Sequence, residues 1–214
     1  MKTAVPFGEA FALAAVEKLG IPAPKVYGVE TFCGRYVILM DQIRGVPLST
    51  ILKEKPKKIG ELMDISVNLQ IAMHNTTLTI LLPVKMVLNA HITHSPGLIP
   101  EEKDQLIEML SKLPDGSSIC HRDFHVGNIL FDGESYTTID WVEIACGCPS
   151  ADACRSYLDY CMLPVKGIEE LYLAKYCAAS DRTREEILAW LPVVAGVVYG
   201  YLPDEGKKIA RPFF

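Results

Sequence analysis

The order of apolar and polar positions predicts a helix and two strands near the N-terminus. Residues 9–19 have helical spacing and end at a glycine followed by two prolines, which stop a helix. Residues 25–29 and 36–40 read as two strands joined around a Cys-Gly pair. The chain therefore begins with mixed α and β structure.

Further along, the pattern predicts mainly helices. Apolar residues recur at helical spacing across residues 59–74, and a proline with two glutamates opens a helix at residues 100–113. Later helices are expected at residues 151–161 and 167–179, and another from Thr183, where Thr-x-x-Glu forms a capping box. The second half of the chain is thus expected to be largely α-helical.

Composition narrows the class of protein. The 214 residues are half apolar and carry a net charge of −5. This charge argues against a nucleic-acid partner, because proteins that bind nucleic acid expose a basic surface.

Seven cysteines without framework spacing predict reduced thiols and a cytoplasmic location, and no cysteine spacing is typical of a zinc module. Residues 187–203 are apolar but contain proline and glycine and are shorter than a span of about 20 residues, so a buried, kinked helix is favoured over a membrane anchor.

The most informative segment is residues 121–140. After Asn128 come two β-prone stretches separated by turn-forming residues, so a hairpin is expected, with Asn128 and Asp140 facing each other at its open end. A carboxylate and an amide oxygen suit Mg²⁺, and Asp123 on the preceding loop is placed to accept a proton from a hydroxyl group. The alternative is a polar turn between buried strands, in which Asp123 caps and Asn128 binds backbone.

Residues 121–128 match the catalytic-loop pattern His-Arg-Asp-x-x-x-x-Asn of protein kinases. His125 stands where protein kinases usually carry lysine, Trp141 follows the metal-binding aspartate, and residues 147–152 resemble a short G-x-P-x-x-D passage. In these features the chain resembles the aminoglycoside phosphotransferase and choline kinase-like family. The resemblance implies an α+β, protein-kinase-like fold and an ATP- and Mg²⁺-dependent phosphotransferase that acts on a hydroxyl of a small molecule.

The resemblance also implies roles for single residues. Asp123 would be the catalytic base, Asn128 and Asp140 the metal ligands, and His121 and Arg122 scaffold residues of the loop. Asp152 would be structural, capping the helix that follows it and bracing the loop. His74 is interpreted as a packed or capping histidine, and His91 and His94 as surface or loop residues.

By the same resemblance, residues 1–44 would be the remnant of an N-terminal β lobe and residues 45–214 the helical C-terminal lobe. Glu9, Asp41 and Ile43 would then contact the nucleotide, Glu9 as the glutamate of the first helix and the other two in the linker between lobes. The Gly-rich loop and the phosphate-binding lysine have no counterpart, and Lys2 is a weak substitute.

An alternative function is therefore a catalytically impaired module that binds a ligand or a partner chain. A third possibility is that the biological start differs from residue 1, or that a neighbouring chain supplies the missing strands. Unpaired strand edges would favour a homodimer. The acceptor is not readable. The acidic residues available for a cationic acceptor are Glu143, Asp159, Glu169 and Glu170, which are more typical of solvated charges.

Overall fold

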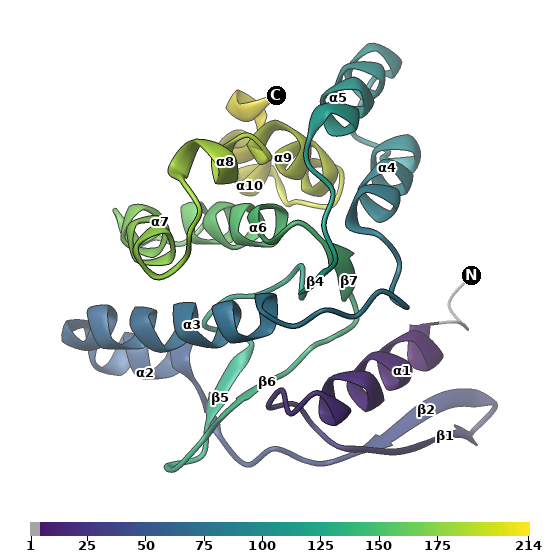
Figure 1. The fold of residues 1–214 in the computed structure, drawn as a ribbon, viewed down its shortest axis with the longest axis vertical. Coiled ribbons are helices and arrows are strands. Elements are labelled where there is room, and N and C mark those ends of the chain that lie inside the picture. The colour runs from purple at the N-terminus through teal and green to yellow at the C-terminus, as the bar shows by residue number, and fades with distance from the viewer. Residues whose placement is uncertain (1–4) are drawn as a thin grey trace. The chain divides into compact units, whose positions relative to one another are not determined.

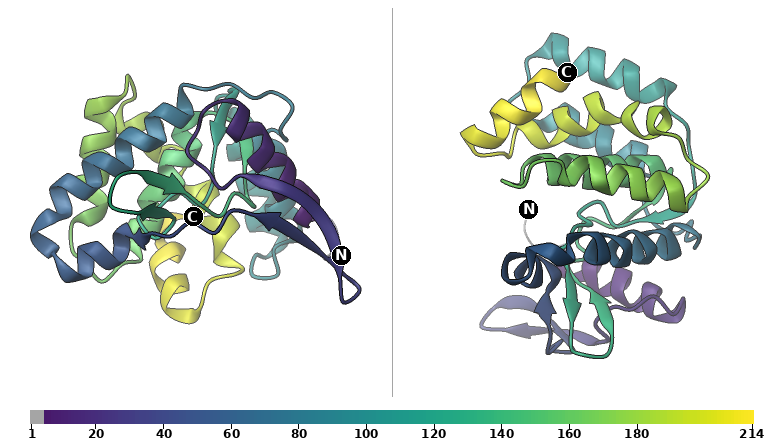
Figure 2. Two further views of the ribbon diagram at one scale, coloured as in Figure 1. Left: turned by 90° about the horizontal axis from the view of Figure 1, so that it is seen from below. Right: turned by 90° about the vertical axis from the view of Figure 1, so that its left-hand side faces the viewer.

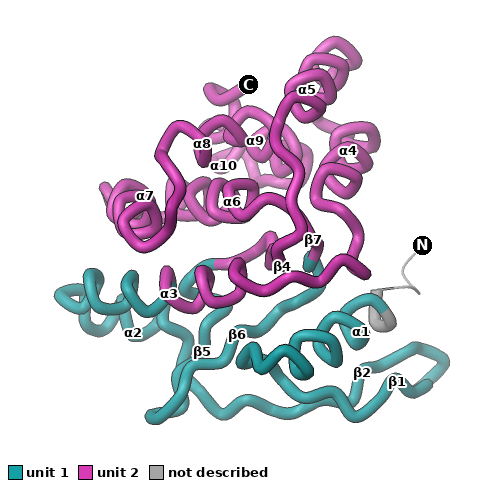
Figure 3. Tube along the Cα trace, viewed as in Figure 1, with its two compact units in different colours: residues 1–66, 125–144 teal, residues 67–124, 145–214 magenta. Residues whose placement is uncertain are grey.

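The computed structural model describes the backbone of residues 5–214 and the side chains from residue 8 onward. The described chain forms two compact units, coloured separately in Figure 3. Unit 1 contains the chain up to Ser66 together with residues 125–144, and unit 2 contains residues 67–124 and 145–214. No helix in the described part is both long and apolar enough to cross a membrane. The predicted lobe boundary after residue 44 is a different division and stays a prediction.

Unit 1 is built from helices at its start and two small antiparallel sheets. Its elements are α1 (Val5–Lys18), β1 (Val26–Phe32), β2 (Arg35–Met40), β3 (Val46–Pro47), α2 (Leu48–Glu54), a 3-10 turn (Pro56–Lys58), the first half of α3 (Ile59–His74), β5 (Ile129–Phe131) and β6 (Tyr136–Thr138). Helix α1 lies along the β1–β2 hairpin, as Figures 1 and 2 show, and buries Ala12, Leu13 and Val16. The helix and the two strands predicted at the start of the chain are confirmed, with bounds shifted by a few residues.

The β5–β6 hairpin is the second sheet of unit 1, with β3 added along β5. Ile129 pairs with Thr138, and Phe131 stacks on its partner Tyr136 with ring centroids 4.7 Å apart. The turn is fixed by Asp132, whose carboxylate accepts hydrogen bonds from the backbone N–H groups of residues 134 and 135. The hairpin predicted in this segment is confirmed.

Unit 2 is mainly helical. Its elements are the second half of α3, α4 (Val84–His94), α5 (Pro100–Lys112), β4 (Ser118–Cys120), β7 (Ala145–Gly147), α6 (Pro149–Cys161), α7 (Ile168–Ala179), α8 (Arg184–Leu188), α9 (Leu191–Tyr199), α10 (Asp204–Ala210) and a 3-10 turn (Arg211–Phe213). Helix α6 is at the centre, because it packs against α7, α8, α9 and β4 and most of its residues are buried. Ile119 of β4 pairs with Cys146 of β7.

Two predictions need correction. Residues 187–203 do not form one kinked helix: α8 ends at Leu188 and α9 begins at Leu191, because Pro192 is tolerated only in the first turn of a helix. The expected burial is confirmed for most of α9, whereas Tyr201 beyond it is 64% exposed. Helix α4 was missed, and it carries both His91 and His94, so neither lies in a loop; the expected surface position is confirmed for His94, which is exposed. It begins after Pro83, and no side chain caps its first turn, so the sequence has no capping motif that marks the start of this helix.

Candidate active site

In unit 2, helix α6 fixes the backbone of the loop that contains the His-Arg-Asp motif. Asp152 accepts a hydrogen bond from the backbone N–H of Arg122 at 2.5 Å, and Ser156 Oγ donates to the carbonyl of Phe124 at 2.7 Å. Arg122 has a φ of 67°, a conformation that costs energy for a residue with a side chain. Strained backbone held in place from both sides is common at functional sites.

The side chain of Asp123 emerges from the middle of this loop and is about one third exposed (30%). Its Oδ1 accepts from Arg155 Nη2 at 3.1 Å. Arg155 in turn donates through Nε to both carboxylate oxygens of Asp159, each at 3.1 Å. Burial raises the pKa of Asp159 to about 7, although Arg155 opposes this shift. Asp159 is therefore not a solvated charge, contrary to the prediction.

A buried polar cluster anchors α6 beneath the loop. Asp152 accepts from Gln70 Nε2 and from His74 Nε2, both at 2.9 Å, and His74 Nδ1 bonds Tyr176 Oη at 2.7 Å. Burial acts to raise the pKa of Asp152, but the bonds from His74, Gln70 and the backbone hold it below its ordinary value. His74 is thus a packed histidine, as predicted. Asp152 braces the loop, but it does not cap α6, whose N-cap is Cys148.

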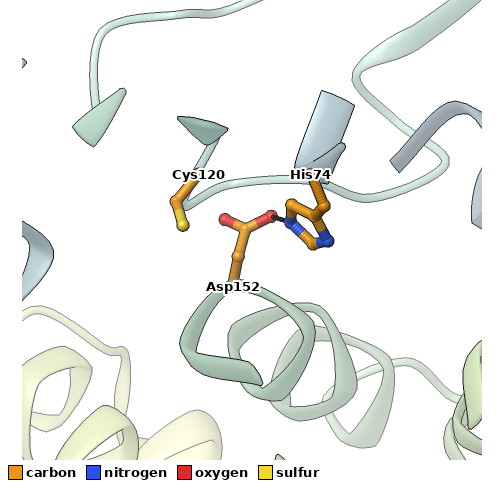
Figure 4. Close-up of side chains that lie close together, drawn as sticks. All are labelled: His74, Cys120 and Asp152. Carbon is orange, nitrogen blue, oxygen red and sulfur yellow. Dashed lines mark hydrogen bonds and ion pairs between the residues drawn. The ribbon is translucent and has the colours of Figure 1, made fainter. Parts of the chain in front are cut away.

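Figure 4 shows the Asp152 carboxylate pointing from α6 toward His74 and Cys120. The potential ligand atoms of these three residues lie within 4.8 Å of one another. A metal would need a deprotonated thiol, yet burial and the nearby Asp152 raise the pKa of Cys120 well above its ordinary value. The nitrogen atoms of His74 and the carboxylate of Asp152 also have hydrogen-bond partners already. The cluster is a structural hydrogen-bond network.

In unit 1, the β5–β6 hairpin places Asn128 and Asp140 at its open end. The backbone N–H of Ile139 donates to the carbonyl of Asn128 at 2.9 Å, which extends the pairing beyond the strands. Trp141 is fully buried and its indole N–H donates to the carbonyl of Thr138 at 2.9 Å. Asp140 has a φ of 63° and is exposed. The buried indole therefore fixes the chain directly after the predicted metal ligand.

A pocket of about 460 Å³ in unit 1 brings together Asp140, Glu9, Asp41 and Ile43. The remaining lining is apolar: Leu13, Pro24, Met40, Leu130, Ile139 and Val142. Burial and the facing carboxylate of Asp140 raise the pKa of Glu9. Among the described residues, neither Glu9 nor Asp140 has a cationic partner. The pocket thus has a largely apolar wall and a pair of carboxylates that a cation would satisfy.

The structure therefore sorts the predicted site residues between the two units. Asp123 belongs to unit 2, and the other five belong to unit 1. Of these five, four line one pocket, and Asn128 lies at the open end of the hairpin that supplies part of its wall. Lys2 lies outside the described residues. The roles of all six stay predictions.

Sequence reasoning predicted that Asp152 braces the loop, but it missed the part played by the other polar residues of α6. Asp152, Arg155, Ser156 and Asp159 are spaced i, i+3, i+4 and i+7, so they lie on one face of the helix. Three of them contact the loop at residues 122–124. A polar stripe on a helix that is otherwise apolar was a signal available in the sequence, although its partners were not.

The comparisons with known proteins give the class of this chain, a phosphotransferase. The sequence model of the phosphotransferase enzyme family matches residues 7–188, and the chain belongs to this family. A search of curated proteins gives no significant match.

Solved structures with the same fold include choline kinase LicA from Streptococcus pneumoniae, at 15% identity and a TM-score of 0.70, covering 97% of this chain and 79% of that one. Another is aminoglycoside phosphotransferase APH(3'')-Id from Streptomyces rimosus with ADP and streptomycin, at 14% identity and a TM-score of 0.63, covering 92% and 83%. A thermostable mutant of aminoglycoside phosphotransferase APH(4)-Ia with AMP-PNP and hygromycin B has 14% identity and a TM-score of 0.70, covering 98% and 80%. The predicted α+β, protein-kinase-like fold is confirmed.

Proposed function

We propose that this protein transfers the γ-phosphate of ATP, with Mg²⁺, to a hydroxyl group of a small molecule, as aminoglycoside phosphotransferases do. The observation that carries the proposal is the unit 1 pocket, where an apolar wall adjoins the paired carboxylates of Glu9 and Asp140. An apolar cleft with a few polar groups is the usual form of a nucleotide site. Family membership and the nucleotide complexes among the structural neighbours support the same class of ligand.

In this proposal each group has a separate task. The apolar wall receives the adenine, and the backbone from Asp41 to Ile43 supplies its hydrogen-bond partners. Asn128 and Asp140 are the residues that would hold Mg²⁺, since they offer the oxygen donors this hard cation prefers. When bound, Mg²⁺ neutralises charge on the transferred phosphoryl group.

Asp123 would accept the hydrogen bond of the acceptor hydroxyl and take its proton as the hydroxyl oxygen bonds to the γ-phosphorus and the bond from that phosphorus to the bridging oxygen of the leaving ADP breaks. Because phosphoryl transfer depends on positioning and on charge stabilisation, the main task of Asp123 is to orient this hydroxyl. The hydrogen bonds from α6 to both sides of Asp123 suit a group whose position matters.

Thermal unfolding with ATP, with and without Mg²⁺, tests the nucleotide site. A ligand at 100 times its Kd stabilises the folded state by about 2.7 kcal/mol, which is readily detected as a rise in Tm. We expect a Mg²⁺-dependent rise that Asp140→Ala removes and Glu134→Ala keeps, since Glu134 is an exposed turn residue of the same hairpin. No rise at millimolar ATP, or an equal rise in Asp140→Ala, would contradict the proposal.

Turnover is tested with a panel of acceptors. Choline, ethanolamine, streptomycin and hygromycin B are incubated with ATP and Mg²⁺, and ADP and phosphorylated product are measured by mass spectrometry. We expect product with at least one hydroxylated amine and none with Asp123→Ala. Nucleotide binding without product from any acceptor would favour the alternative of a catalytically impaired binding module.

We also propose that the protein forms homodimers in the cytoplasm. The β1–β2 hairpin exposes apolar side chains to solvent, with Phe32 69% and Leu39 54% exposed. Exposed apolar side chains on the strands of a small sheet favour association with a second chain. All seven cysteines are free, which suits a reducing compartment. Light scattering after size-exclusion chromatography tests the dimer, and a monomer at high concentration would exclude it; cell fractionation tests the location.

A further inference from the structure

We infer that Arg155 is a positioning residue, which holds the carboxylate of Asp123 in the orientation needed to receive the acceptor hydroxyl. The inference rests on the proposed function, in which Asp123 performs that task. It concerns unit 2 alone and adds a residue outside the His-Arg-Asp motif to the machinery of the site.

The contacts of α6 with the loop divide into two kinds. Asp152 and Ser156 bind backbone atoms on either side of Asp123, namely the N–H of Arg122 and the carbonyl of Phe124. These bonds fix where the Cα of Asp123 lies, but they leave its side-chain torsion angles undetermined. The bond from Arg155 Nη2 to Asp123 Oδ1, at 3.1 Å, acts on the carboxylate itself.

The side chain of Arg155 is itself fixed by Asp159 on the same helix. Its Nε lies 3.1 Å from both carboxylate oxygens of Asp159, and its Nη2 lies 3.0 Å from Asp159 Oδ1. Both side chains are largely screened from solvent, with 26% of Arg155 and 16% of Asp159 exposed. A guanidinium group is planar and holds two carboxylates at fixed angles, whereas the ammonium group of lysine is a point charge on a flexible stem. The Asp159–Arg155 pair is therefore a pre-ordered support for Asp123.

The test compares Arg155→Met and Arg155→Lys with the wild-type protein. A displacement of about 1 Å in a reacting group can lower the rate by about 10²-fold. We expect Arg155→Met to lower kcat by about this factor with an unchanged KM for ATP, and Arg155→Lys to recover part of the loss. Arg211→Met is the matched control, since it removes the same side chain from an ion pair with Glu102, and its kcat should equal that of the wild type. Turnover is measured with the best acceptor of the panel, or with water as acceptor if none reacts.

A structural role and a positioning role differ in two further measurements. Crystal structures of the wild type and Arg155→Met should show the loop backbone and α6 unchanged while the Asp123 carboxylate rotates or occupies several rotamers. Asp159→Asn should give a smaller loss of kcat, because Arg155 keeps its charge but loses its support.

An unchanged kcat, an Asp123 carboxylate in its original rotamer, or a loss of kcat that follows a displaced loop would each overturn the inference. The crystal structures decide it even if the wild type has no turnover at all. In that case the proposed function fails by itself, while the geometric claim about Asp123 is still tested.

Discussion

Replacement of Asp152 by alanine should be among the most destabilising single changes in unit 2. The carboxylate is fully buried and accepts three hydrogen bonds, from Gln70, from His74 and from the backbone N–H of Arg122. Each buried donor left without a partner costs about 1–3 kcal/mol. Gln70 Nε2 keeps its bond to Ser156 Oγ and His74 keeps its bond to Tyr176, so we expect a loss of about 4 kcal/mol in the free energy of unfolding. That is a large share of the stability of about 5–15 kcal/mol of most domains.

Urea unfolding of wild type and Asp152→Ala, followed by tryptophan fluorescence, measures this loss. Asp104→Ala, at an exposed position on α5, is the control and should change stability by less than about 0.5 kcal/mol. Acid gives a second test. Because the folded-state pKa of Asp152 lies below its ordinary value, its contribution is complete above that ordinary value, near pH 4, and is lost as the pH falls further through the folded-state pKa. A loss below about 1 kcal/mol in the alanine variant would refute the view that this network holds the loop.

Three further predictions concern single positions. Gly116→Ala should destabilise the protein by about 1–3 kcal/mol in urea unfolding, because the added Cβ would lie 2.5 Å from a backbone oxygen of β7. Gly60→Ala is the control: it lies in α3 with open space around it, so it should be neutral or stabilise the protein by up to about 1 kcal/mol. Thr183→Ala removes the capping box of α8 and should lower the urea midpoint by an amount equivalent to about 1 kcal/mol, whereas Thr183→Ser should retain most of it. Since the pKa of Asp159 is raised to about 7, the folded state holds a proton there that the unfolded chain releases, so stability should rise as the pH falls from about 7 to about 4; an equal pH profile in Asp159→Asn would contradict this.

Much of the fold was predictable because its elements carry local signals. The capping box at Thr183, the proline that opens α5 and the turn residues of the β5–β6 hairpin each act within a few positions along the chain. Helix α4 has no such start, and the break between α8 and α9 depends on where one proline falls within an apolar run. Where a boundary is set by packing, sequence reasoning placed it wrongly or missed it.

The site follows the same division between local and distant information. The sequence could place Asn128 and Asp140 at the open end of one hairpin, because a short turn fixes which positions lie there; the register sets Asn128 opposite Ile139, the residue before Asp140. The contacts of α6 with the loop join residues some 30 positions apart, and those of Asp152 with α3 join residues about 80 apart. No spacing rule connects positions so distant.

A buried carboxylate, by contrast, does carry information in a sequence, because it must find donors when it folds. Asp152 and Asp159 lie seven residues apart on the same face of α6 as Arg155, inside a helix whose other positions are mostly apolar. Such a stripe must either face solvent or bind another part of the chain. Since most of α6 is buried, the stripe has little access to solvent, and the adjoining loop with the His-Arg-Asp motif supplies partners for it. Polar stripes on predicted core helices are therefore a useful place to look for the residues that support a catalytic loop.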